Sequence, residues 1–216
     1  MSIILWGTSE SPYVRKVKVT LAEKELKYQQ HEVLPKVLML KLKQSIPERF
    51  LEVSPLGKVP AIEVDDFFIS DSNVIIGYID DKFQQGTKLF QESPEDKAKI
   101  RWFLQYEQDV LTPVIHNIIF KEKIVKQKLL KQQHDSNKVA EVINIKLPII
   151  FNYLTKQLGD HEWLVGEQFS AADITIATHF ISLQKADINI DKDKYPVLVK
   201  YIDHVLSRKS FSALSR

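Results

Sequence analysis

The sequence contains no cysteine among its 216 residues. This absence excludes a disulfide framework, a cysteine-ligated metal site and a cysteine nucleophile. Six histidines are present, but none of them stands in an H-x-x-x-H or H-E-x-x-H pattern. We therefore expect no metal cofactor.

The chain also lacks an excess of charge of one sign. Its 30 Lys and Arg residues stand against 28 Asp and Glu residues, which gives a formal net charge of +2 at pH 7. Nucleic-acid-binding proteins concentrate basic charge on one face, and most basic residues here are lysines rather than the forked arginines that suit phosphate. We therefore expect no nucleic-acid partner.

Long hydrophobic runs are missing as well. No apolar run approaches the roughly 20 residues needed to cross a bilayer, and no basic segment precedes the apolar start at residues 3–6. We expect no membrane association and a cytoplasmic location. At 44% hydrophobic and 27% charged residues, the composition is that of a globular protein, which excludes wholesale disorder.

The first 83 residues alternate strand and helix signals. Residues 3–6 predict a buried strand, apolar residues at helical spacing predict a helix from Pro12 to about Glu25, and residues 28–33 favour a second strand. This order predicts a parallel pair of strands. Two short segments with strand signals, 61–64 and 67–69, flank an acidic dipeptide and predict a hairpin.

The remainder of the chain is helical by pattern. Residues 71–83 predict a helix, residues 84–93 a linker, and four further helices follow at 94–123, 137–158, 171–183 and 196–207. The expected fold class is therefore an α/β domain over residues 1–83 followed by an all-helical domain over residues 94–216.

One candidate site lies at Ser11-Pro12, where the first strand turns into the first helix. The free N–H groups and the dipole of a helix N-terminus favour negative charge, and a serine hydroxyl there can donate to an anion. The alternative is that Ser11 serves only as the helix N-cap.

Two further candidates are the segments 54–61 and 70–73. Pro60 directly before a strand suggests a cis Val59–Pro60 bond, which leaves the Val59 backbone pointing at a ligand; an ordinary trans proline is the alternative. Asp71 and Ser72 together can hold the ammonium and carboxylate of an amino-acid group, or can simply cap the following helix. A fourth segment, Ser170 to Asp173, predicts a structural capping box.

In this order and spacing, the motifs resemble the cytosolic glutathione S-transferase family over nearly the whole chain. The strongest parts are Ser-Pro-Tyr-Val-Arg-Lys-Val from Ser11, Ser-Pro-Leu-Gly-Lys-Val-Pro-Ala-Ile from Ser54 and Asp-Ser-Asn-Val-Ile-Ile-Gly-Tyr-Ile-Asp from Asp71. The resemblance implies a thioredoxin-like first domain, a helical second domain, a cis Pro60 and a homodimer, and it points to a serine-type, bacterial-like member.

The resemblance also implies a site for glutathione as co-substrate. Ser11 matches the residue that provides the catalytic hydroxyl, and Lys58 matches a basic residue whose side chain reaches the glycyl carboxylate of glutathione. The Val59 backbone meets the cysteinyl unit, while Asp71 and Ser72 hold the γ-glutamyl group. Asp71 departs from the commoner Glu or Gln. Two other hydroxyls nearby remain alternatives to Ser11: Ser9 and Tyr13.

The electrophile is expected between the two domains. Candidate residues for that pocket are Tyr106, Val110 and His116, with Trp6, Pro113 and Phe120 as further members; helix-bundle core is the alternative for each.

The expected function is conjugation of the glutathione thiolate to small apolar electrophiles, a detoxification reaction, with glutathione-dependent peroxidase activity as a further expectation. The alternative is a non-catalytic protein-interaction module on the same scaffold, resembling stringent starvation proteins. A ligand-storage role has no specific support in the sequence.

Overall fold

A computed structural model describes residues 1–212 and 214 of the chain. The described residues form two compact units, one made of residues 1–90 together with residues 209–212 and 214, and the other of residues 91–208.

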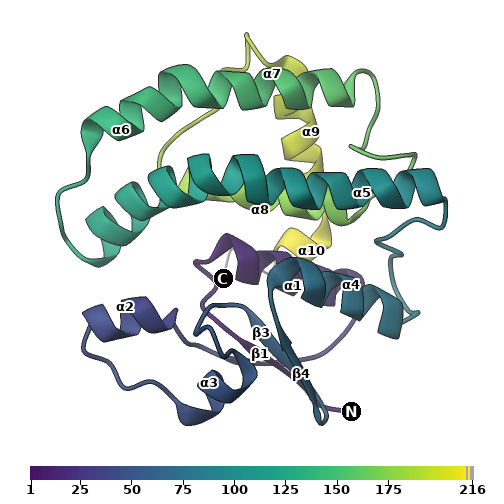
Figure 1. Cartoon of the computed structure of the whole chain (residues 1–216). Helices are drawn as coiled ribbons and strands as arrows, with labels where there is room; N and C mark the ends of the chain where they lie inside the picture. Colours follow the sequence, from purple (N-terminus) through teal and green to yellow (C-terminus); the bar gives the residue numbers. More distant parts are fainter. Residues whose placement is uncertain (213, 215–216) are drawn as a thin grey trace. The chain divides into compact units, whose positions relative to one another are not determined.

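A four-stranded sheet in the order β2-β1-β3-β4 organises the first unit (Figure 1). β1 (Ile3–Trp6) pairs in parallel with β2 (Gln29–His31) and antiparallel with β3 (Ala61–Val64). β3 in turn forms a hairpin with β4 (Phe67–Ser70). The parallel pair and the hairpin confirm both sequence predictions for this sheet.

The described part of the first unit also contains the helices α1 (Pro12–Glu23), α2 (Lys36–Lys41), α3 (Glu48–Val53), α4 (Ser72–Lys82) and α10 (Lys209–Ser212). α1 packs beside α4 on one face of the sheet, and α3 packs against β3 and β4 (Figure 1). Val14, Val17 and Leu21 of α1 are fully buried. Their spacing of three and four residues is what turns a single helical stripe toward the sheet.

The second unit is wholly helical among its described residues. Its helices are α5 (Pro94–Tyr106), η1 (Glu107–Leu129), α6 (Ser136–Glu141), η2 (Val142–Lys146), α7 (Leu147–Leu158), α8 (Ala171–Lys185) and α9 (Pro196–Leu206). η1 and η2 are wider, π-type continuations of α5 and α6, so the two long predicted helices exist but change their winding along the way. Within residues 1–212 and 214, no helix is both long and apolar enough to span a membrane.

α8 forms the centre of the second unit, and its start is fixed by the predicted capping box. Asp173 accepts hydrogen bonds from the Ser170 amide at 2.9 Å, the Leu164 amide at 3.0 Å and the Tyr201 hydroxyl at 2.7 Å. Complete burial raises the pKa of Asp173 above its ordinary value. The capping box thus ties α8 to α9 and has the structural role that the sequence predicted.

The described end of the chain differs from the expected domain of residues 94–216. α10 packs on α1, and the Ser210 hydroxyl donates to Oε1 of the buried Glu23 at 2.6 Å. The contact joins residues 187 positions apart, a separation at which local sequence patterns carry no information.

Gly86 brings the segment after α4 against the end of α1. Its φ is +69°, and a Cβ atom placed there would lie 2.1 Å from the Glu23 carbonyl oxygen. The same carbonyl accepts from the Thr87 amide at 2.9 Å, and the Thr87 hydroxyl donates to Oε2 of Glu23 at 2.6 Å. This approach of backbone to backbone requires glycine.

Gly86→Ala is therefore expected to lower the free energy of unfolding by about 2–3 kcal/mol, through the clash and the left-handed backbone. Gly77 of α4 is the matched control, because a Cβ there has nothing within 4 Å. Gly77→Ala is expected to raise stability by about 0.5–1 kcal/mol, the helix propensity difference. Urea denaturation compares the two variants, and equal midpoints would contradict the role of Gly86.

Candidate functional site

Three segments that the sequence predicts to be functional meet at the same end of strands β1, β3 and β4. Trp6, the last residue of β1, is paired with Ala61, and Ala61 is paired with Ser70, the last residue of β4. The chain leaves β1 toward Ser11, enters β3 from Val59 and leaves β4 at residue 71. The strand register therefore brings these segments to the same end of three adjacent strands.

Ser11 stands at the N-cap of α1 without acting as a side-chain cap. Its amide donates to the Thr8 carbonyl at 3.1 Å, which closes the turn that leads from β1 into the helix. The residue is 7% exposed, and its side chain makes no capping hydrogen bond. The purely capping role that the sequence left open is therefore absent, and the hydroxyl remains available to a ligand beside the N–H groups that start the helix.

Asp71 caps α4 in a strained conformation. Its φ is +83°, which is rare for a residue with a side chain, and its Oδ1 accepts from the amides of Asn73 at 2.9 Å and Val74 at 3.2 Å. Such strain persists only where the surroundings hold it, and it concentrates at ligand sites. Oδ2 has no hydrogen-bond partner in the described part of the chain, so one carboxylate oxygen caps the helix and the other faces outward.

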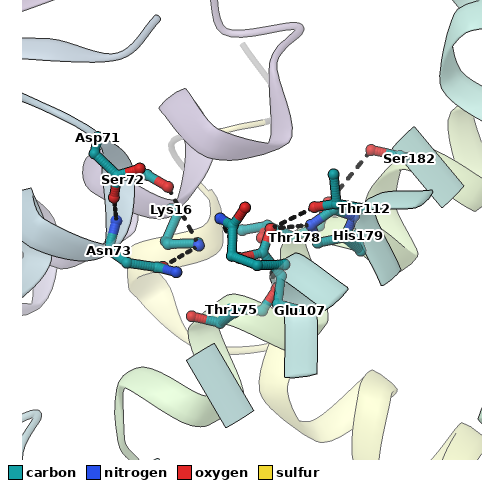
Figure 2. A network of polar contacts seen from close by, with 11 residues as sticks. Lys16, Asp71, Ser72, Asn73, Glu107, Thr112, Thr175, Thr178, His179 and Ser182 are labelled. Atoms are coloured by element: carbon teal, nitrogen blue, oxygen red, sulfur yellow. Dashed lines mark hydrogen bonds and ion pairs between the residues drawn. The ribbon is translucent and has the colours of Figure 1, made fainter. Parts of the chain in front are cut away.

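The Ser72 side chain accepts a hydrogen bond from a buried lysine that was not predicted from the sequence. The buried Lys16 ammonium donates to the Ser72 hydroxyl oxygen at 3.3 Å and to Oδ1 of Asn73 at 2.6 Å (Figure 2). Because the Ser72 oxygen accepts from Lys16, its own proton can donate to a bound carboxylate. Apolar periodicity gave no reason to expect a buried lysine on α1, and only the packing of α1 against α4 reveals it.

The segment before β3 has the predicted cis Val59–Pro60 bond. The Ser54 hydroxyl donates to the Lys58 carbonyl at 2.7 Å and accepts from the Lys58 amide at 3.1 Å, which fixes the backbone there. Neither the amide nor the carbonyl of Val59 is hydrogen-bonded to any described residue. Lys58 itself is exposed. The segment thus offers one backbone edge and one cation to a ligand.

The hydroxyls of Ser9 and Tyr13 are placed differently from that of Ser11. The Ser9 oxygen accepts from the Lys18 ammonium at 2.8 Å and from Nε2 of Gln30 at 3.2 Å. Tyr13 lies in the first turn of α1, and the Lys16 ammonium is 5.9 Å from its ring centroid. The Ser9 hydroxyl is therefore engaged by two donors, whereas the Ser11 hydroxyl has no hydrogen-bond partner in residues 1–212 and 214.

The aromatic candidates for the electrophile pocket in the second unit belong to two stacked ring pairs. Tyr106 is buried and stacks on Tyr153 with ring centroids 4.6 Å apart, and burial together with Tyr153 raises the pKa of Tyr106 to about 12. His116 is partly buried and stacks on Phe120 at 5.1 Å.

Three other candidates for the electrophile pocket belong to neither of these aromatic pairs. Val110 is partly buried on η1, and Pro113 is exposed. Trp6 belongs to the sheet of the first unit, where its indole N–H donates to Oε1 of Glu63 at 2.6 Å.

A buried acid–base pair in the second unit was also missed from the sequence. Nε2 of His179 on α8 lies 2.8 Å from Oε1 of Glu107 on η1, with both side chains fully buried (Figure 2). The Thr112 hydroxyl donates to the same carboxylate oxygen at 3.2 Å. The pair joins η1 to α8, and no periodic pattern marks two polar residues that are 72 positions apart.

The sheet order, its helices and the cis proline before β3 define a thioredoxin-like domain followed by a helical domain. Residues 5–87 match the family model described as glutathione S-transferase, N-terminal domain, and residues 107–209 match glutathione S-transferase, C-terminal domain. The chain belongs to the glutathione S-transferase family.

Individual relatives agree with this assignment along the whole chain. A glutathione S-transferase of Hyoscyamus muticus is 27% identical over 213 residues, covering 98% of this chain and 97% of the relative. A stringent starvation protein A homolog of Haemophilus influenzae is also 27% identical, over 96% of this chain and 87% of the relative. A solved glutathione S-transferase of Rhodospirillum rubrum has a TM-score of 0.86 at 24% identity, covering 98% of this chain and 91% of the solved chain, and supports the fold.

Proposed function

We propose that this protein transfers glutathione to small apolar electrophiles and that the Ser11 hydroxyl stabilises the glutathione thiolate. The observation that carries the proposal is the hydroxyl of Ser11, a largely buried residue at the start of α1, which makes no capping hydrogen bond. The segments that contain Ser11, Val59 and Asp71, which meet at one end of the strands, supply the remaining contacts to the tripeptide.

The chemistry follows from the acidity of the thiol. A free thiol has a pKa near ~8.5, so at neutral pH most of it is protonated, while the thiolate is the nucleophile. A donated hydrogen bond and a helix N-terminus both stabilise the thiolate and lower the thiol pKa. Ser11 keeps its own proton throughout, and the thiol proton leaves to solvent. The glutathione sulfur then attacks the electrophile, and with a halo-nitrobenzene the new carbon–sulfur bond replaces the carbon–halogen bond as the halide leaves. Holding both reactants together saves association entropy.

Each part of glutathione has a matching group in the first unit. The outward oxygen of Asp71 suits the γ-glutamyl ammonium, and the Ser72 hydroxyl, held by Lys16, suits the γ-glutamyl carboxylate. The unpaired backbone edge of Val59 suits the cysteinyl unit, and the exposed Lys58 ammonium suits the glycyl carboxylate. In the second unit, Tyr106, Val110 and His116 remain the proposed electrophile contacts.

A second candidate function is a protein-interaction module without catalysis. The observation in its favour is the similarity to a stringent starvation protein A homolog, which covers nearly all of this chain. The free hydroxyl of Ser11 and the free carboxylate oxygen of Asp71 favour a working glutathione site instead, because an interaction module has no need for them.

Calorimetric titration with glutathione separates the two candidates. The transferase proposal expects saturable binding, weakened about five- to tenfold in Lys58→Ala, which loses a charge-assisted contact worth about 1 kcal/mol or more. Lys27 is exposed and serves as the control, so Lys27→Ala is expected to bind like the wild type. No heat on titration, together with no conjugation of a halo-nitrobenzene, would reject the proposal and favour the interaction module.

The finer parts of the proposal have their own assays. Peroxidase activity is tested with a hydroperoxide and glutathione. A homodimer, expected from the family resemblance, is tested by light scattering. A cytoplasmic location, expected from the lack of long hydrophobic runs in the sequence, is tested by cell fractionation. Exposed Phe67 and Phe68 on the edge strand β4 and exposed Val74 on α4 supply an apolar surface suited to a second copy of the chain.

A further inference from the structure

Ser11 and Lys18 share one side of α1. They are seven residues apart, close to two helical turns, so both lie on the same stripe of the helix surface. Helical side chains lean toward the N-terminus, so the long Lys18 side chain reaches back along this stripe toward the turn that precedes α1. There its ammonium donates to the Ser9 hydroxyl oxygen at 2.8 Å.

Ser9 belongs to the turn that orients Ser11. The turn spans Thr8 to Ser11, closed by the Ser11 amide on the Thr8 carbonyl at 3.1 Å. A short turn has few independent torsions, so a restraint on Ser9 is transmitted to Ser11 two residues later. Lys18 therefore restrains Ser9, which lies two residues before the proposed catalytic serine in the same turn.

Lys18 is the main restraint on the Ser9 side chain. The Gln30 amide group also approaches the Ser9 oxygen, at 3.2 Å, but it has two hydrogens and two closer acceptors. These are the Gly7 carbonyl at 2.8 Å and Oε1 of Glu32 at 2.7 Å. The pKa of Lys18 is lowered, because the effect of burial outweighs the opposing effect of nearby Glu32, so the ammonium is partly shielded from water while it donates to Ser9. A hydrogen bond from such a cation is stronger than one at an exposed site.

We propose that Lys18 is a positioning residue for catalysis, which fixes the Thr8–Ser11 turn through the Ser9 hydroxyl and thereby aims the Ser11 hydroxyl at the glutathione sulfur. The inference rests on the proposed function and assigns Ser9 an anchoring role rather than that of thiolate donor. In this proposal Lys18 acts through Ser9 rather than on a substrate, so its loss should change the acidity of the bound thiol and the turnover more than the affinity for glutathione.

The test compares Lys18→Gln, Ser9→Ala, the double variant and Lys18→Arg, with Lys27→Gln as the control for loss of a lysine charge. Thiolate absorbance of bound glutathione against pH gives the thiol pKa, and steady-state kinetics give kcat and KM. We expect Lys18→Gln and Ser9→Ala each to lower kcat about three- to tenfold, the effect of one lost orienting hydrogen bond, and to raise the thiol pKa. KM for glutathione should stay within about twofold of the wild type.

The double variant tests whether Lys18 acts through Ser9. If it does, the double variant is no slower than Ser9→Ala alone, and Lys18→Arg restores most of the turnover. Multiplied effects in the double variant, or wild-type kcat and thiol pKa in Lys18→Gln, would overturn the inference. A larger loss in Ser9→Ala than in Ser11→Ala would overturn it too, because Ser9 would then be the donor. Absence of glutathione binding by the wild type rejects the proposed function itself, whereas an active wild type with an unaffected Lys18→Gln rejects only this inference.

Discussion

Replacing Ser11 with alanine is expected to lower kcat/KM for conjugation roughly 10- to 150-fold, the value of one hydrogen bond to a charged group at about 1.5–3 kcal/mol. The thiol pKa of bound glutathione should rise by about one to two units, because each unit corresponds to about 1.4 kcal/mol. Thiolate absorbance and initial rates with a chromogenic halo-nitrobenzene measure both quantities. Affinity for glutathione should change little, since Lys58, Asp71 and Ser72 remain.

Ser93 provides the matched control for this substitution. It also stands at a helix N-cap, but its hydroxyl accepts from the Asp96 amide at 3.3 Å. Ser93→Ala should therefore lose about 1 kcal/mol of stability and keep its activity. Ser11→Ala should keep its stability and lose its activity. The opposite pattern, with Ser11→Ala destabilised and fully active, would show that Ser11 is a helix cap and that Ser9 or Tyr13 donates to the sulfur.

The second large effect, on stability, is expected for substitution of Asp80, which connects three parts of the first unit. Its Oδ1 accepts from the Lys24 ammonium at 3.0 Å and the Leu89 amide at 2.9 Å, and its Oδ2 accepts from the Phe90 amide at 3.0 Å. Asp80 and Lys24 are both fully buried. The carboxylate thus joins α4, α1 and the chain that follows them through one buried charge pair.

Asp80→Asn is expected to lower the free energy of unfolding by about 3–5 kcal/mol, because it leaves a buried ammonium without its counter-charge. Lys88 is the control: its ammonium lies 3.3 Å from Oδ2 of Asp80, but its side chain is 40% exposed. Lys88→Ala should cost less than about 1 kcal/mol, as surface ion pairs do. Urea unfolding followed by circular dichroism distinguishes the two, and equal losses in both variants would contradict the expectation for Asp80.

The sequence could predict the segments of the candidate site because each has a local signature. Ser11 precedes a proline at a helix start, Pro60 precedes a strand, and Asp71 follows one. Such local patterns gave the strands, the hairpin and the capping box of α8 correctly. The register that brings the segments together required pairing between strands more than 50 residues apart, for which the chain carries no local mark.

What sequence reasoning missed are the polar groups that support these residues. Lys16 and Lys18 sit among apolar residues of α1, where periodicity identifies the buried stripe but assigns no partner to a lysine. Their partners, Ser72 with Asn73 and Ser9, come from other elements. Glu107 and His179 are hidden in the same way within the helical unit. Which hydroxyl is free and which is engaged is decided by such distant partners.

The pairing of Trp6, Ala61 and Ser70 has a consequence for how the glutathione segments can vary. These three residues are paired with one another across three adjacent hydrogen-bonded strands. The loops that adjoin them are therefore attached to the same part of the sheet. A side chain on any loop can be exchanged without altering the spacing between anchor points. The side chains that contact the ligand can therefore change one at a time while the spacing between the loops stays constant. Only a substitution at the paired residues themselves would alter that spacing.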